Sequence, residues 1–173
     1  MGSAGMIYFG RVRETIFGDL WLACSDLGLV ALEWQRAQSD FLVTLQKRYP
    51  KAEFEENPRR LALAASELRE YLDSKRKQFS IQIDWSGMHE FQRQALLATY
   101  AIPYGQTSTY GDLAQQLGRP RAARAVGRAE ATNPMPIVIP CHRVLGADGK
   151  LRGYGGGLEV KKWLLQMEGA VLA

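Results

Sequence analysis

The sequence has few cysteines and no long hydrophobic run, and both absences restrict the classes of protein it can encode. Only two of the 173 residues are cysteines, Cys24 and Cys141, too few for a disulfide framework. No apolar run approaches the roughly 20 residues that a membrane-spanning helix needs. A structural zinc site would need both cysteines to converge with the distant His89 and His142. We therefore expect a cytoplasmic protein with free thiols and no bound metal.

The positive charge is concentrated in one half of the chain. The formal net charge is +4 at pH 7, and residues 1–86 contain equal numbers of basic and acidic residues. The whole excess therefore lies in residues 87–173, which makes this half the better candidate for contact with a polyanion such as nucleic acid. An excess of four is modest, so charge alone does not predict nucleic-acid binding.

Hydrophobic periodicity predicts two domains of different character. In residues 1–86 it predicts strands at 7–15, 18–24, 29–34 and 79–83, with helices at 42–48 and 57–77. In residues 87–173 it predicts mainly helices, at 90–102, 110–118, 121–131 and 158–168. The sequence therefore predicts an α+β protein with an N-terminal domain at 1–86 and a C-terminal domain at 87–173.

Two of these helices are predicted to form a helix-turn-helix. Thr109-Tyr110-Gly111-Asp112 matches a capping box, and Gly118 suits the end of the first helix. Pro120 suits the first turn of the second helix. A helix pair of this kind binds DNA in many proteins, but it also occurs in ordinary helical cores.

The second helix combines a basic face with small side chains. At about 100° per residue, Arg121, Arg124 and Arg128 fall within about 60° of one another, whereas Glu130 lies on the opposite side. The small residues that accompany them are Ala122, Ala123, Ala125 and Gly127. Small side chains allow close approach, which suits the narrow minor groove better than base reading in the major groove. The alternative is a solvated basic face on a packed helix.

A proline-rich segment leads to Cys141. Three prolines restrict φ in Asn133-Pro134-Met135-Pro136-Ile137-Val138-Ile139-Pro140-Cys141-His142-Arg143-Val144. We expect its apolar residues to be buried and the segment to be rigid. A neighbouring histidine or arginine lowers a thiol pKa from about 8.5, and the thiolate is a nucleophile. The segment therefore predicts a reactive cysteine, with an inert buried thiol as the alternative.

Pro140-Cys141-His142-Arg143-Val144 resembles the active-site motif of the O(6)-alkylguanine-DNA alkyltransferases, also called methylated-DNA–protein-cysteine methyltransferases. The likeness covers nearly all of residues 87–173, and its further segments are Arg124-Ala125-Val126-Gly127, Asn133-Pro134, Gly153-Tyr154-Gly155-Gly156-Gly157 and Leu164-Leu165-Gln166-Met167-Glu168-Gly169. It implies a small RNase-H-like N-terminal domain, which the first half fits loosely, followed by a mostly helical, winged-helix-like domain.

The resemblance implies that Cys141 accepts an alkyl group from O(6)-alkylguanine in DNA, directly, irreversibly and once per protein molecule. His142, through a water, and Glu168 would help the thiol lose its proton, and Asn133 would brace the site. Tyr110 would donate a hydrogen bond to the guanine ring. No cofactor is implied.

The resemblance also implies minor-groove binding to double-stranded DNA and extrusion of the damaged nucleotide. Arg124 would fill the gap in the base stack, and Val144, Tyr154 and Gly155 would line the base pocket. The remaining implied DNA contacts come from Tyr110, Arg121, Ala122, Ala123, Ala125, Gly127 and Arg128. We expect a monomer in solution, associated with the nucleoid in a bacterial or archaeal cell, and leave O(4)-alkylthymine open as a second lesion.

Three other functions compete with this one. An alkyltransferase-like lesion binder would lack the acceptor, and the presence of Cys141 argues against it. A helix-turn-helix regulator would need base-reading side chains, of which the second helix has few. A cysteine hydrolase would pair Cys141 directly with His142, but adjacent residues of an extended segment point in opposite directions. The glycine-rich loop at 152–157 lacks the Lys-Ser/Thr pair of a P-loop, which excludes nucleoside triphosphate binding there.

Overall fold

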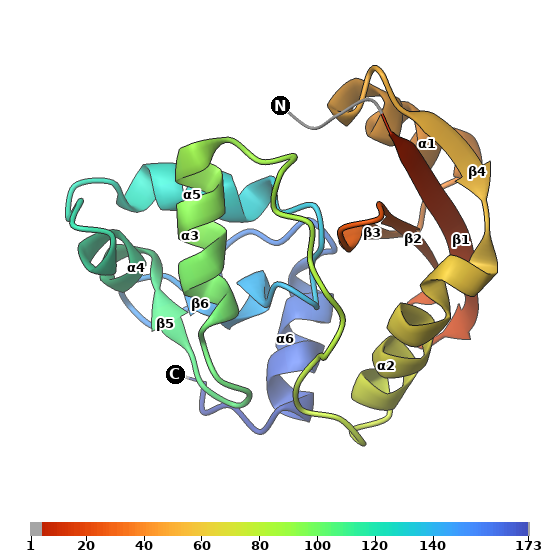
Figure 1. The fold of residues 1–173 in the computed structure, drawn as a ribbon. Helices are drawn as coiled ribbons and strands as arrows, with labels where there is room; N and C mark the ends of the chain where they lie inside the picture. The colour runs from red at the N-terminus through yellow and green to blue at the C-terminus, as the bar shows by residue number, and fades with distance from the viewer. Residues whose placement is uncertain (1–4, 173) are drawn as a thin grey trace. The chain divides into compact units, whose positions relative to one another are not determined.

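A computed structural model describes residues 5–172, and the chain divides into two compact units with the boundary after Gly87. Unit 1 is built around a sheet, and unit 2 is mostly helical (Figure 1). The predicted α+β class is therefore confirmed. Among residues 5–172, none of the helices combines the length and the apolar composition that crossing a bilayer requires.

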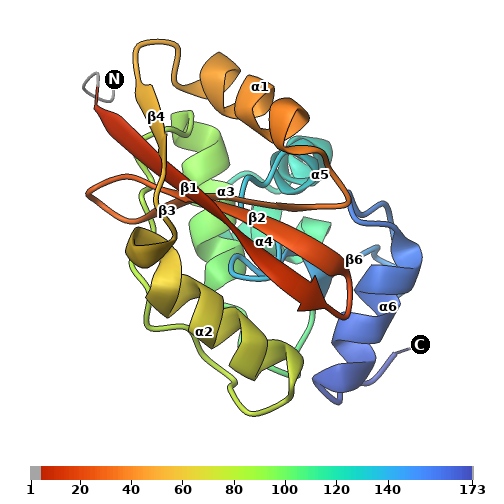
Figure 2. The ribbon, with the colours of Figure 1, turned by 90° about the vertical axis from the view of Figure 1, so that its right-hand side faces the viewer.

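Unit 1 contains a four-stranded sheet with the order β3-β2-β1-β4. The strands are β1 (Met6–Thr15), β2 (Gly18–Cys24), β3 (Leu29–Trp34) and β4 (Glu53–Glu56). The first three form an antiparallel meander. The helix α1 (Gln38–Arg48) then returns the chain to β4, which pairs in parallel with the first half of β1 (Figure 2).

The two faces of this sheet are covered by different segments. Phe41 and Leu45 of α1 are fully buried in one cluster with Phe9 of β1. Successive residues of a strand point to opposite faces, so Gly10 faces the other side. A Cβ atom at Gly10 would lie 3.1 Å from Leu61 Cδ1. That face is therefore covered by the 3₁₀ turn η1 (Pro58–Leu61) and the helix α2 (Ala62–Leu72) that follows it.

Two predictions for unit 1 are wrong. Segment 79–83 is not a strand: only Ile83 forms an isolated bridge, to Leu29. The carboxylate of Glu67 accepts hydrogen bonds from Ser80 N (2.9 Å) and Ile81 N (3.3 Å), so a side chain replaces a strand partner. The predicted helix 57–77 is instead η1 followed by α2, which ends at Leu72.

The described part of unit 2 contains four α-helices, of which the first three pack around a second core (Figure 1). They are α3 (Glu90–Tyr100), α4 (Tyr110–Gln116), α5 (Ala123–Ala131) and α6 (Leu158–Met167). The short strands β5 (Ser108–Thr109) and β6 (Val144–Leu145) pair in parallel, with Thr109 opposite Leu145. Because β6 directly follows the 3₁₀ turn η2 (Cys141–Arg143), this pairing holds the start of α4 beside the cysteine segment.

The helix-turn-helix is formed by α4 and α5. Thr109 Oγ1 accepts a hydrogen bond from Asp112 N at 3.0 Å, which confirms the predicted N-cap. The helix ends before Gly118, whose φ of 70° suits glycine after a helix terminus. The second helix begins later than predicted, because Ala122 N donates to Arg119 O and closes a turn first. Arg121 therefore lies in the turn before α5 and not on its basic face.

Candidate active site and nucleic-acid interface

Asn133 holds together the two ends of the loop that carries Cys141. Its Nδ2 donates to Ile139 O at 2.9 Å, and its Oδ1 accepts from Met135 N at 3.0 Å. Ile139 N in turn donates to Met135 O at 2.9 Å. The predicted bracing role of Asn133 thus has a geometric basis: one amide side chain satisfies backbone groups on both sides of the loop.

The loop also contains a strained residue that sequence analysis did not foresee. Ile137 has a φ of 77°, in a region that β-branched side chains rarely adopt. Such a conformation costs about 1–3 kcal/mol and persists only when the surroundings enforce it. The Ile137 side chain is 1% exposed, so burial in the core offsets the strain and fixes the path of the chain towards Cys141.

Cys141 is buried, and its environment opposes ionisation. The residue is 6% exposed at the start of η2. Burial raises the pKa of its thiol to about 12, and the nearby Glu130 carboxyl adds to the rise, while Asn133 and Lys161 act in the opposite direction. The prediction that neighbouring groups lower this pKa is therefore wrong, because desolvation outweighs them. The thiol needs a base to react.

His142 and Arg143, which directly follow Cys141 in the chain, form a buried network with Glu168. Glu168 Oε1 accepts from Arg143 Nη2 at 2.7 Å and lies 2.9 Å from His142 Nε2, and Glu168 Oε2 accepts from Arg143 Nε at 2.9 Å and Gly105 N at 3.2 Å. Arg143 Nη1 also donates to Ile102 O at 2.6 Å. These contacts fix the carboxylate just beyond the end of α6 and hold the imidazole against it.

The charge of Glu168 determines which nitrogen of His142 carries the proton. Burial acts to raise the Glu168 pKa, but hydrogen bonds from His142 and Arg143 outweigh it and lower the pKa to about 2. An ionised carboxylate only accepts hydrogen bonds, so His142 Nε2 must be the donor. Burial lowers the His142 pKa, which keeps the ring neutral. His142 Nδ1 then has the lone pair and is the basic atom of the site.

Lys161 and Glu130 are buried ionisable residues of the site that sequence analysis did not assign to it. Lys161 is fully buried on α6, and its Nζ donates to Val144 O (2.7 Å) and Arg152 O (3.1 Å). Burial lowers its pKa to about 8. Glu130 of α5 is 7% exposed, pointing away from the arginine face as expected.

The buried face of α6 differs from the predicted one. The spacing of apolar residues in the sequence predicts that Val160, Trp163, Leu164 and Met167 face the core; of these, only Leu164 is fully buried, and Lys161 and Leu165 join it. Positions 161, 164 and 165 have helical spacing i, i+3, i+4, which could have identified the buried lysine. Its charge argued for an exposed position because lone lysines are almost never fully buried.

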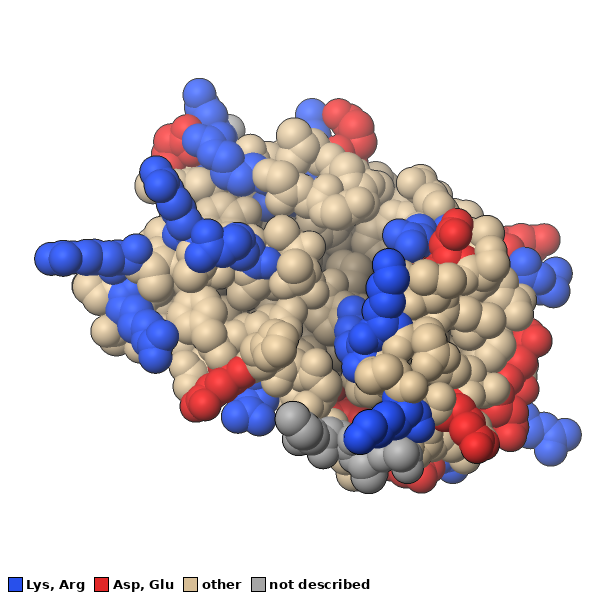
Figure 3. Space-filling view, turned by 90° about the horizontal axis from the view of Figure 1, so that it is seen from above, with Lys and Arg blue, Asp and Glu red and all other residues tan. Residues whose placement is uncertain are grey.

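The predicted DNA-binding residues surround α5. Arg121, Arg124 and Arg128 are exposed, and Ala123, Ala125 and Gly127 are half-buried, whereas Ala122 packs against the core of unit 2. In the view of Figure 3, several Lys and Arg side chains project from one side of the molecular surface. The structure thus leaves the basic residues of this helix accessible to a polyanion.

Tyr110 connects this face to the cysteine loop. It is the first residue of α4, half-buried against the core of unit 2. A Cβ atom at Gly127 would lie 3.9 Å from Tyr110 Cδ1, so the ring packs beside α5. Burial raises the Tyr110 pKa, which keeps its hydroxyl protonated and able to donate.

The residues predicted to line a base pocket lie in two places: Val144 close to Cys141 in the sequence, and Tyr154 and Gly155 on the loop before α6. Val144 is fully buried directly after η2, and its carbonyl accepts from Lys161. Tyr154 is half-buried and Gly155 exposed, in the segment without regular structure before α6. Tyr154 O accepts from Gly157 N at 2.9 Å, which shapes this loop.

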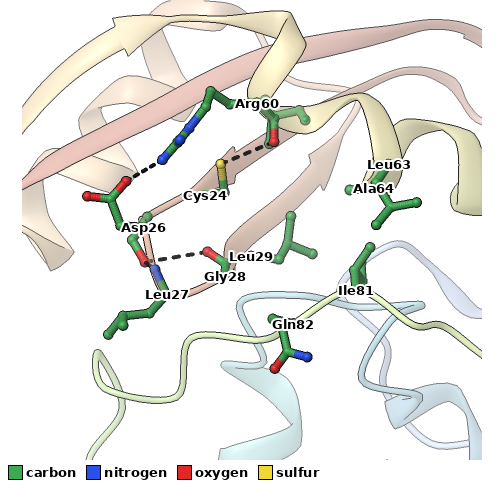
Figure 4. Close-up of a pocket in the computed structure, with 12 residues that line it drawn as sticks. Cys24, Asp26, Leu27, Gly28, Leu29, Arg60, Leu63, Ala64, Ile81 and Gln82 are labelled. Atoms are coloured by element: carbon green, nitrogen blue, oxygen red, sulfur yellow. Dashed lines mark hydrogen bonds and ion pairs between the residues drawn. The ribbon is translucent and has the colours of Figure 1, made fainter.

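Unit 1 has a hollow of its own, of about 300 Å³, that contains none of the predicted site residues (Figure 4). Cys24 lies at its edge, where the thiol donates to Arg60 O at 3.7 Å. Burial raises the pKa of this thiol too. Cys24 therefore behaves as a small core residue.

Comparisons with known proteins find matches to both halves of the chain. The family model described as "6-O-methylguanine DNA methyltransferase, DNA binding domain" matches residues 90–170, and that of the ribonuclease-like domain of the same family matches residues 8–85. The methylated-DNA–protein-cysteine methyltransferases of Shigella flexneri and Methanosarcina barkeri are each 40% identical over 91% of this chain and 94% of theirs. The crystal structure of Mycobacterium tuberculosis OGT in complex with DNA is 34% identical, with a TM-score of 0.78 over 94% of this chain and 92% of that one.

Proposed function

The chain belongs to the 6-O-methylguanine DNA methyltransferase family, and from that membership we propose how its own residues repair alkylated DNA. Its activity is that of a methylated-DNA–protein-cysteine methyltransferase: direct repair by transfer of an alkyl group from DNA to protein. Cys141 is the acceptor: it follows the loop braced by Asn133 and directly precedes His142, the buried base.

Proton removal comes first. The Cys141 thiol passes its proton through a water to His142 Nδ1, while His142 Nε2 stays bonded to Glu168. The resulting imidazolium is stabilised by the ionised carboxylate, whose orientation Arg143 fixes. The single observation that supports this role best is the 2.9 Å contact between His142 and Glu168, both fully buried side chains.

Transfer is then a single displacement. The thiolate sulfur forms a bond to the alkyl carbon, and the bond between that carbon and guanine O6 breaks with its electron pair moving to guanine. Tyr110, kept protonated by burial, donates a hydrogen bond to the departing base and stabilises its charge. The product is a neutral thioether that no described group is placed to hydrolyse, so each protein molecule acts once.

The lesion reaches this buried sulfur by base flipping. Arg124 inserts into the stack and replaces the extruded nucleotide, offsetting an unstacking cost of a few kcal/mol. Arg121 and Arg128, both exposed, contact phosphates. Val144, Tyr154 and Gly155 receive the flipped base. The partner is double-stranded DNA that carries O(6)-alkylguanine. The protein binds it as a monomer in the cytoplasm.

Substitution of the acceptor tests this function. Cys141→Ala should abolish removal of O(6)-methylguanine from a duplex oligonucleotide and leave DNA binding, measured by fluorescence anisotropy, within about twofold. Cys24→Ala is the matched control, because it removes the other thiol and should transfer at the normal rate. Loss of the lesion with the Cys141 variant would show that another nucleophile is responsible.

A further inference from the structure

Glu130 is a buried carboxyl group that the alkyl-transfer scheme above does not use. It lies on the buried side of α5, with 7% of its surface exposed, whereas Arg124 on the same helix is exposed. Thr99 of α3 donates from its hydroxyl to Glu130 Oε1 at 2.5 Å. The other oxygen, Oε2, is shielded from solvent and has no hydrogen-bond partner among the described residues. A buried carboxylate with half of its acceptors unsatisfied is costly.

Besides Thr99, groups on three other elements interact electrostatically with Glu130. Electrostatic coupling connects its carboxyl with Tyr110 of α4, Cys141 of η2 and Lys161 of α6. Lys161 is the single cation of this set, and its ammonium is held in place by two carbonyl oxygens. A buried region with one fixed cation favours one anion over two, because like charges repel strongly where water is excluded.

We propose that Glu130 controls the charge of the alkyl-transfer site: its carboxyl must be neutral when Cys141 forms its thiolate, so that Lys161 balances a single negative charge. Glu130 is a positioning residue in this scheme, because it acts on the substrate only through the cysteine. The inference rests on the proposed function, since it concerns the same nucleophile.

The titration of Glu130 makes this arrangement relevant near neutral pH. Burial raises its pKa to about 7, and the hydrogen bond from Thr99 opposes the rise. Below pH 7 the carboxyl is mostly neutral and Cys141 is free to ionise against Lys161. Above pH 7 the carboxylate forms first and suppresses the thiolate. Because the thiol proton passes to His142 and not to solvent, transfer should stay level below about pH 7 and fall above it.

The test compares the pH profiles of matched variants. Single-turnover transfer from O(6)-methylguanine duplex DNA would be measured between pH 6 and 8 for the natural chain, Glu130→Gln and Glu159→Gln. Glu130→Gln keeps the shape and can still accept from Thr99, whereas Glu159 is exposed on α6 and controls for net charge. If the carboxylate shifts the thiol pKa by one unit, the Glu130→Gln rate should match the natural rate at pH 6 and exceed it about fivefold at pH 8. Glu159→Gln should follow the natural profile.

Thr99→Val provides an independent variant that retains the carboxyl. Loss of the hydrogen bond raises the Glu130 pKa further, so the fall in the transfer rate should begin at a higher pH. Alkylation of Cys141 by iodoacetamide, read from the mass of its peptide, should show the same pH ratios without any DNA.

Two results would overturn the inference. One is a Glu130→Gln profile parallel to the natural one at every pH, either unchanged or lowered by a constant factor, which would indicate a packing role alone. The other is a Thr99→Val profile in which the fall in the transfer rate begins at the same pH as in the natural chain. Failure of the proposed function would look different, since the natural chain would then leave Cys141 unmethylated by DNA at any pH.

Discussion

Glu168→Gln should nearly abolish alkyl transfer by reversing the tautomer of His142. In the natural chain the carboxylate accepts from His142 Nε2 at 2.9 Å, which leaves Nδ1 as the base. A glutamine amide can donate to Nε2 instead, and the ring proton then moves to Nδ1, where it blocks proton removal from Cys141. The equivalent change in a serine protease triad lowers the rate by about 10⁴, so we expect a loss of about 10³- to 10⁴-fold.

The same substitution should destabilise the fold. Glu168 accepts from both Arg143 Nε (2.9 Å) and Arg143 Nη2 (2.7 Å), and Arg143 is 7% exposed. Removing one partner of such a buried pair costs about 3–5 kcal/mol, a large part of a typical stability of about 5–15 kcal/mol. Urea unfolding would measure this loss, and single-turnover transfer would be assayed only under conditions where the variant is folded.

Arg143→Lys separates the two effects. Lysine keeps the positive charge beside Glu168 but loses the paired contacts, so stability should fall while the tautomer of His142 is retained. Its transfer rate should therefore stay within about tenfold of the natural rate. A folded Glu168→Gln protein that transfers within threefold of the natural chain would refute the tautomer argument, as would equal activity losses in the two variants at equal stability.

Three further outcomes follow from the same geometry. Asn133→Ala removes hydrogen bonds to Ile139 O and Met135 N and should lower the free energy of unfolding by about 1–3 kcal/mol, measured in urea; an unchanged midpoint would contradict the bracing role. Arg124→Ala should slow repair of duplex DNA about tenfold or more while leaving reaction with the free modified base unchanged, and equal losses on both substrates would rule out stack filling. The pKa of Glu168 is lowered from 4.5 to about 2, so the stability that its ionised form contributes is complete above pH 4.5 and disappears as the pH falls towards 2; urea midpoints of the natural chain should fall more steeply across this window than those of Glu168→Gln.

Local signals allowed the helix-turn-helix to be predicted from the sequence. The N-cap at Thr109 and the glycine at 118 act over a few residues, and the structure shows both as expected. The start of α5 was missed because a turn closed by Ala122 and Arg119 comes before it. Segment 79–83 was missed for a related reason: its backbone amides bond to a glutamate side chain from α2, a tertiary contact that strand periodicity does not encode.

The electrostatics of the site could not be predicted from adjacency in the sequence. A histidine and an arginine follow Cys141 in the sequence, which suggested a lowered thiol pKa. However, Arg143 is hydrogen-bonded to Glu168 and to Ile102 O, and His142 is neutral. Burial is therefore the largest influence on the pKa of the Cys141 thiol, and it raises this pKa. The burial of Lys161 was not predicted because its charge suggested an exposed position, although its spacing on α6 matches that of the core residues.

The most direct test of the account is the mass of the peptide that contains Cys141 after the natural chain is mixed with duplex DNA carrying one O(6)-methylguanine. We predict a gain of one methyl group on that peptide, none on the peptide with Cys24, and one methylated protein for each lesion removed. Disappearance of the lesion without any change in the Cys141 peptide would contradict the account.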